Sequence, residues 1–88
     1  MVNTRRSELE IIDEILDLSK NGAKTTELLY QCNLSYTQLK NYIAYLLEKN
    51  IIEEKAVKNG NGSNKLYVTT ERGNHLRSDI KKTLNYLR

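Results

Sequence analysis

The chain has few of the residues that mark secreted, metal-binding or membrane proteins. Its 88 residues include one cysteine, one histidine and no proline, phenylalanine or tryptophan. A single thiol, Cys32, builds no disulfide framework, and no cluster of His and Cys is present to hold zinc. No apolar run approaches the roughly 18 residues of a membrane span. The first residues, MVNTRRSELE, lack an apolar signal segment, so we expect a cytoplasmic protein without membrane contact.

The length of the chain and the placement of its charges limit the number of domains and the kinds of partner that it could bind. Eighty-eight residues allow one domain with a modest core, in which some of the six tyrosines must pack. Residues 1–50 hold six basic and seven acidic side chains, whereas residues 51–88 hold eight and four. Two stretches, 28–47 and 55–70, contain no acid at all. Surfaces without acid suit phosphate binding, although an ordinary uneven surface gives the same pattern.

A first helix is predicted over about 7–20. Ser7 and Glu10 have the spacing of a capping box, and apolar residues then fall on one half of a helical wheel. Asn21 and Gly22 end the helix, because both tolerate the left-handed conformation. The other half of the wheel carries acids that we expect to be solvated: Glu10, Asp13, Glu14 and Asp17.

A helix-turn-helix is predicted next. Its helices cover about 26–32 and 36–49, with the turn at Asn33, and the second begins with another capping box, Ser35 with Gln38. The candidate caps of the shorter helix are Thr25 and Thr26. We expect Tyr36 and Tyr42 at the edge of the core.

A β-hairpin follows the second of these helices. Strands are predicted over about 51–57 and 65–68, joined by the Gly/Asn-rich loop 58–64. Helix-turn-helix followed by hairpin is the element order of a winged helix. We therefore predict one domain over 1–88, mainly α with a small β-hairpin (α+β), of the winged helix-turn-helix class.

The last helix is predicted over about 71–87, with Thr69 or Thr70 as its cap. One narrow apolar stripe runs along it, and its spacing suits a coiled-coil seam. Residues 71–88 are therefore the candidate dimerisation element, with contacts from Leu76, Ile80, Thr83, Leu84 and Leu87.

Catalysis is not indicated. His75 falls on the polar side of the last helix, where a solvated histidine is expected, and Cys32 falls on an apolar face, where a structural thiol is expected. The glycines of 58–64 lack the strand–loop–helix context of a phosphate cradle. We therefore expect no enzyme, no cofactor, no metal and no small-molecule substrate.

The pattern favours binding to double-stranded DNA. A helix in the major groove must offer polar groups to base edges without repelling phosphates. The third predicted helix offers Gln38, Lys40, Asn41, Ala44 and Tyr45 on one face. Phosphate contacts are expected at its start, from Ser35 and Thr37. Flanking backbone contacts are expected from Arg5, Arg6, Lys24, Thr25 and Thr26. The wing offers Lys58, Asn59, Asn61, Asn64 and Lys65.

Three segments carry a family resemblance: LEIIDEIL, NLSYTQLKNYIAYLLEKNII and YVTTERGNHL. With them the chain resembles the archaeal winged-helix DNA-binding proteins of the Sso-ten-a type, which are small chromatin-associated or regulatory proteins. The resemblance implies DNA binding through the third helix and the wing, nucleoid association, and a homodimer formed by the C-terminal helix. Two features depart from the family: the chain stops sooner, at Arg88, and its wing loop is longer.

A winged-helix module that binds other proteins instead of DNA is the alternative, because fold alone does not fix function. The net charge of +3 and the single lysine, Lys40, on the recognition face keep this alternative open. RNA binding has little support, because no aromatic stacking surface is evident.

Overall fold

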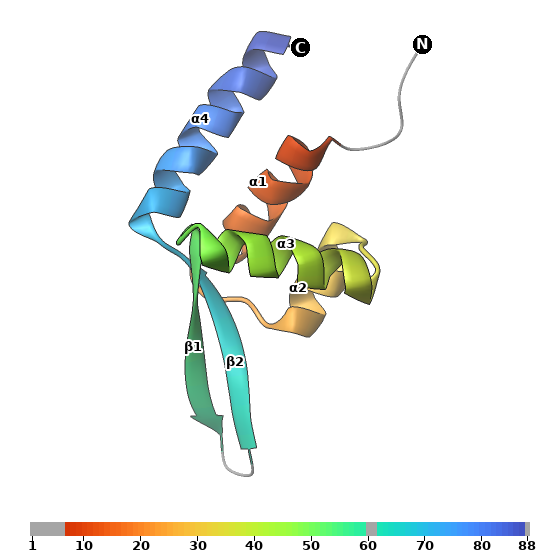
Figure 1. The fold of residues 1–88 in the computed structure, drawn as a ribbon, viewed down its shortest axis with the longest axis vertical. Helices are drawn as coiled ribbons and strands as arrows, with labels where there is room; N and C mark the ends of the chain where they lie inside the picture. The colour runs from red at the N-terminus through yellow and green to blue at the C-terminus, as the bar shows by residue number, and fades with distance from the viewer. Residues whose placement is uncertain (1–6, 60–61, 88) are drawn as a thin grey trace.

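The computed structural model describes residues 7–59 and 62–87 and shows a three-helix unit with a projecting hairpin and a last helix beside α1 (Figure 1). The elements are, in order, α1 (Glu8–Leu18), α2 (Thr25–Cys32), α3 (Tyr36–Glu48), β1 (Ile52–Asn59), β2 (Gly62–Thr69) and α4 (Glu71–Leu87). The predicted winged-helix order is confirmed. Among the described residues, no helix has the length and apolar character needed to cross a membrane.

The helix ends follow local signals in the sequence, with one exception. Both predicted capping boxes form, Ser7 with Glu10 and Ser35 with Gln38. Asn33 adopts the left-handed conformation (φ 53°) between α2 and α3, as predicted. The exception is α2: its N-cap is Lys24, without a side-chain hydrogen bond, so the prediction of a threonine cap is wrong. Thr25 is already the first residue of that helix.

The hairpin is longer than predicted. β1 and β2 pair antiparallel from Ile52 opposite Thr69 to Asn59 opposite Gly62, so most of the predicted loop 58–64 is strand. The two residues between the strands, 60 and 61, lie outside the described part. The prediction failed because antiparallel pairing joins main-chain groups, which Gly and Asn carry like any other residue. Ala23 adds a single bridge to the hairpin, through main-chain bonds of 3.0 and 2.9 Å with Tyr67.

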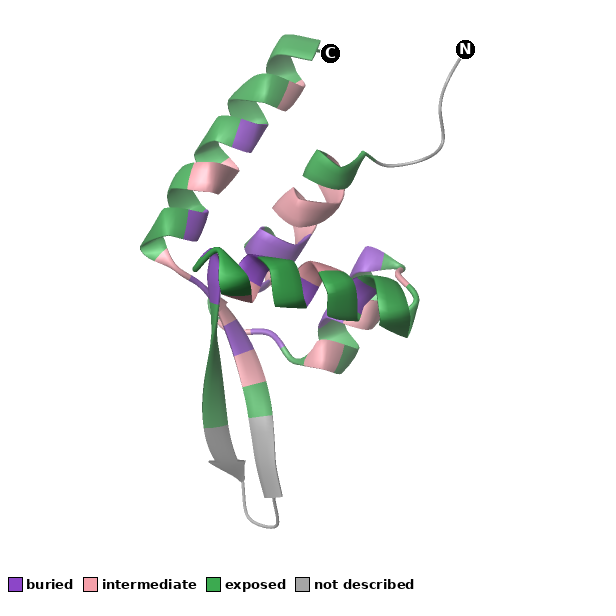
Figure 2. Ribbon diagram, in the orientation of Figure 1, coloured by how far each residue is buried: buried purple, intermediate pink, exposed green. Residues whose placement is uncertain are grey.

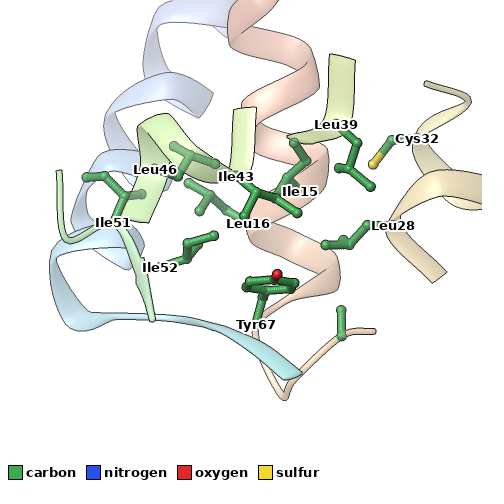
Figure 3. Close-up of a cluster of buried hydrophobic side chains, with 11 residues drawn as sticks. Ile15, Leu16, Leu28, Cys32, Leu39, Ile43, Leu46, Ile51, Ile52 and Tyr67 are labelled. Carbon is green, nitrogen blue, oxygen red and sulfur yellow. The ribbon is translucent and has the colours of Figure 1, made fainter. Parts of the chain in front are cut away.

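One core joins the three-helix unit to the base of the hairpin (Figure 3). Its members are Ile15, Leu16, Ala23, Leu28, Cys32, Leu39, Ile43, Leu46, Ile51, Ile52 and Tyr67. Tyr67 is the tyrosine that enters the core (8% exposed), and Tyr42 packs at its edge, as predicted. Tyr36 does not: it is 62% exposed, because it lies one turn before Leu39, the first buried residue of α3.

The start of α4 is anchored to the hairpin and to the end of α3. Thr70, rather than Thr69, caps the helix: its Oγ1 accepts a hydrogen bond from Gly73 N at 3.0 Å and lies 2.9 Å from Ile51 O, to which it donates. Thr69 Oγ1 instead donates to Leu16 O at 2.7 Å, in a buried position. These bonds fix the direction in which α4 leaves the hairpin.

Farther along, α4 is tied to α1 by an ion-pair cluster. Arg77 Nη2 lies 2.7 Å from Asp17 Oδ1, and Arg77 Nε lies 3.3 Å from Asp13 Oδ1. The side chains of Arg77 and Asp13 are largely covered. The prediction that the acids of α1 are simply solvated is therefore wrong for Asp13, which is largely covered, whereas Asp17 stays exposed and is also paired with Arg77.

We predict that Gly73→Ala destabilises the protein. A Cβ atom at residue 73 would lie 2.2 Å from Ile51 O and 2.7 Å from Thr69 Cγ2, so α4 would have to move off the hairpin. Such overpacking outweighs the roughly 1 kcal/mol that alanine gains in a helix, and we expect a net loss of about 2 kcal/mol in the free energy of unfolding. Urea denaturation measures it. Ser78→Ala, at an exposed position of the same helix, is the control; equal stability of both variants would contradict the packing described.

Candidate nucleic-acid interface

The outer face of α3 is a continuous polar surface. Leu39, Ile43 and Leu46 are buried and turn the opposite side of the helix to solvent (Figure 2). We call that side the reading face, and all its members are exposed: Thr37, Gln38, Lys40, Asn41, Ala44 and Tyr45. The structure thus brings these predicted residues together, while their contacts with DNA stay a prediction.

At the start of α3 the capping box uses part of the predicted phosphate site. Ser35 Oγ accepts a hydrogen bond from Gln38 N at 3.2 Å, and Gln38 Oε1 accepts one from Ser35 N at 3.0 Å. Of the four amides that no helical carbonyl reaches, those of Tyr36 and Thr37 are left to donate to an anion.

The two amide side chains of the reading face differ in freedom. A bidentate contact to adenine needs both the oxygen and the nitrogen of an amide. Gln38 would have to share Oε1 with the capping bond to Ser35 N. Within the described part of the chain no hydrogen bond holds the Asn41 side chain, so Asn41 is the better candidate for base reading.

A second cation lies at the end of this surface. Lys49 Nζ is 5.9 Å from the centroid of the Tyr45 ring, and Tyr45 is 53% exposed. The sequence reasoning missed Lys49, although its i, i+4 spacing from Tyr45 is a visible signal. Lys49 adds positive charge beside the reading face.

The base of the wing is less basic than predicted. Lys65 Nζ lies 3.5 Å from Glu54 Oε1, and Lys55 Nζ lies 3.6 Å from Glu53 Oε1. These glutamates precede the acid-free window 55–70, and only the strand pairing brings Glu54 next to Lys65. The predicted contacts Lys58, Asn59 and Asn64 are in the strands, but their side chains lie outside the described residues, as do Asn61, Arg5 and Arg6.

The flank formed by α2 lies beside the hairpin. Ala23 is bonded to Tyr67 of β2, so the segment that leads into α2 lies beside that strand (Figure 1). Lys24 and Thr26 are exposed, whereas Thr25 is half-buried. The residues of this flank for which backbone contacts were predicted therefore lie next to the wing.

The predicted dimer stripe is divided by the structure. Ile80 is buried and Leu76 packs against the core, so the first half of α4 is used within the chain. Leu84 is half-buried, whereas Thr83 and Leu87 are exposed. Tyr86, which the sequence reasoning did not single out, is 91% exposed.

The two residues considered for catalysis, His75 and Cys32, lie in separate parts of the fold. His75 is exposed on α4, and Cys32 is fully buried in the core. Throughout residues 7–59 and 62–87, no three His, Cys, Asp or Glu side chains gather where they could hold a metal ion.

Comparison with protein families and relatives gives two matches in sequence. The family described as winged helix-turn-helix matches residues 5–87. The uncharacterized protein MJ0290 of Methanocaldococcus jannaschii is 29% identical over 86 residues, which make up 97% of this chain and 37% of that protein. The chain thus spans little more than a third of the length of this relative.

Solved structures share the fold. Sso10a-2, a DNA-binding protein from Sulfolobus solfataricus, matches with a TM-score of 0.78 and 23% identity over 92% of this chain and 81% of its own. A PadR family transcriptional regulator from Eggerthella lenta matches with 0.79 and 15% over 88% and 73%. ZitR, a zinc-responsive MarR family member from Lactococcus lactis, matches with 0.64 and 16% over 98% and 63%. These matches confirm the expected winged-helix fold and the resemblance to the Sso-ten-a type.

We predict that Ser35→Ala lowers the free energy of unfolding by about 1 kcal/mol, because an amide at the start of α3 loses its cap. The reciprocal bond, from the main-chain N of residue 35 to Gln38 Oε1, does not use the serine side chain. Thermal denaturation by circular dichroism measures the loss of stability. Thr37→Ala, at an exposed position without a capping role, is the control. An equal loss of unfolding free energy in that variant would show that the Ser35 cap does not stabilise α3 specifically.

Proposed function

The chain belongs to the winged helix-turn-helix family, and on that basis we propose that it binds double-stranded DNA as a transcriptional regulator or chromatin-associated protein. The observation that carries the proposal is the reading face: six exposed side chains on one side of a firmly packed helix, in a stretch without acid from residue 28 to 47. Two structural neighbours support it: Sso10a-2 is a DNA-binding protein, and the PadR protein is a transcriptional regulator.

The dimensions of α3 suit the major groove. Its 13 residues span about 20 Å at roughly 1.5 Å per residue, and the groove is about 12 Å wide. In the proposed pose Asn41 reads a base edge, Lys40 reaches a phosphate or guanine, and Ala44 allows close approach. The amides of Tyr36 and Thr37 hold a phosphate at the start of the helix.

The wing supplies a second, weaker contact in this proposal. Lys65 is exposed and paired with Glu54 at 3.5 Å, and exposed pairs of this kind contribute at most about 1 kcal/mol. Lys65 can therefore exchange Glu54 for a DNA phosphate at small cost. Glu53 and Glu54 limit how much positive charge the wing base presents, so we assign most of the affinity to α3.

We also propose that the protein is a homodimer through the distal half of α4. The exposed Leu87 and the half-buried Leu84 are large apolar side chains on one side of the end of this helix, whereas Tyr86 projects from the other side. Leu76 and Ile80 already pack within the chain, so the contact between copies is shorter than the full stripe. Two copies would present two reading faces to one duplex.

We predict that Lys40→Glu weakens binding to duplex DNA about tenfold at low salt, because it replaces a phosphate contact by repulsion. The slope of log affinity against log salt concentration should fall by about 1. Fluorescence anisotropy at several salt concentrations measures both. Lys82→Glu, the same charge change at an exposed position of α4, is the control.

Two outcomes of this titration would contradict the proposal. Equal affinity of the Lys40→Glu and Lys82→Glu variants would remove α3 from the interface. Absence of any binding by the unchanged protein at low salt would favour the alternative, a winged helix that binds other proteins.

We predict that the double variant Leu84→Glu/Leu87→Glu sediments as a monomer, because four carboxylates would face each other across the contact. Ser78→Glu/Lys82→Glu adds two acids on exposed positions of the opposite side of α4 and should sediment like the unchanged protein. Identical sedimentation of both double variants would show that the distal half of α4 is not the dimer contact.

A further inference from the structure

A groove of about 670 Å³ lies between the first turns of α1 and the outer side of α3. We propose that this groove binds a small aromatic cation and that its occupation excludes DNA. Binding of the cation is a property of the protein alone, whereas the exclusion of DNA rests on the proposed function. Its lining comprises Glu8, Leu9, Ile12, Gln38, Asn41, Tyr42 and Tyr45.

The groove has the size and the surface of a ligand site. Its volume falls within the range of roughly 300–1,000 Å³ that small-molecule pockets cover. Leu9 is 39% exposed and contributes an apolar side chain to the wall of the groove. Ile12 and Tyr42 are half-buried below it and pack against the core, so the floor is apolar and held in place.

The charge of the groove indicates a cation. Among the described residues that line it, Glu8 is the one that carries a charge. The aromatic wall suits the same ligand, because the negative face of a tyrosine ring attracts ammonium groups. The Lys49 ammonium lies 5.9 Å from the Tyr45 ring centroid, so this ring already attracts a cation, which the ligand would have to displace. An apolar or aromatic body would lie on Leu9 and Ile12.

The groove shares three residues with the reading face: Gln38, Asn41 and Tyr45. A ligand that contacts Asn41 and Tyr45 from the α1 side occupies the same side chains that the proposed DNA contact uses. Ligand and DNA therefore compete, which would make the groove a place where a small molecule releases the protein from DNA. Glu8 and Leu9 lie on α1, outside the reading face. Variants at these residues can therefore change ligand binding without altering the side chains of the proposed DNA contact.

The first experiment tests the site without DNA. Benzyltrimethylammonium, benzyl alcohol and benzoate are titrated into the full chain, and the backbone amide signals are followed by NMR. We expect saturable shifts at Leu9, Ile12 and Tyr45 with the cation, at least tenfold weaker binding of the alcohol, and none of benzoate. Glu8→Gln should reduce cation binding to the level of the alcohol. Glu27→Gln, an exposed acid of α2, should leave it unchanged.

The second experiment adds duplex DNA. Benzyltrimethylammonium should release the unchanged protein from the duplex, whereas tetramethylammonium at the same concentration should not. Glu8→Gln should bind DNA normally and resist release. Cation binding without any DNA binding would refute the proposed function and the competition while leaving the site intact.

Three results would overturn the site: no saturable shift, benzoate binding as tightly as the cation, or full cation binding by Glu8→Gln. A fourth is a change of sedimentation in Leu9→Ser without cation binding by the unchanged protein, which would assign the groove to a second copy of the chain.

Discussion

Leu39, Ile43 and Leu46 of α3 pack in one cluster with Ile15 and Leu16 of α1 and with the hairpin residue Tyr67 (Figure 3). This contact decides which side of α3 faces solvent, and therefore which side chains can meet a ligand. Each of these leucine and isoleucine side chains gains about 1.5–3 kcal/mol from burial, far more than any exposed ion pair of the wing. The reading face is thus a consequence of the core rather than of its own polar contacts.

The wing and α4, the two elements beside the core, are also oriented by buried contacts. The wing starts from Ile51 and Ile52, which are buried, so its base has a fixed direction. α4 is held by Thr70, by the close approach of Gly73 to Ile51 O, and by Arg77 against α1. Any dimer contact at the end of α4 is therefore linked rigidly to the orientation of α3. In the proposed dimer, the relative placement of the two reading faces depends on these few contacts.

Local features of this fold were predictable from the sequence, and contacts between distant segments were not. The capping boxes at Ser7 and Ser35 and the turn at Asn33 depend on neighbours within a few residues. The exposure of Lys40 and Asn41 follows from the helical period. The pairing of Lys65 with Glu54, the clamp of Arg77 on α1 and the groove below Leu9 depend on how elements meet in space. Strand pairing through the Gly/Asn-rich segment was also not predicted, because main-chain hydrogen bonds leave no pattern in the side chains.

The central claim is that the outer side of α3 meets DNA while α1 and α4 do not. Backbone NMR shifts of the unchanged protein during titration with a short duplex test it most directly. The account predicts that the largest shifts fall on residues 35–45, with smaller ones on Lys24 and Lys65 and little change at Asp13, Asp17 or Lys82. Shifts concentrated on α1 or α4, or no shifts at low salt, would contradict it.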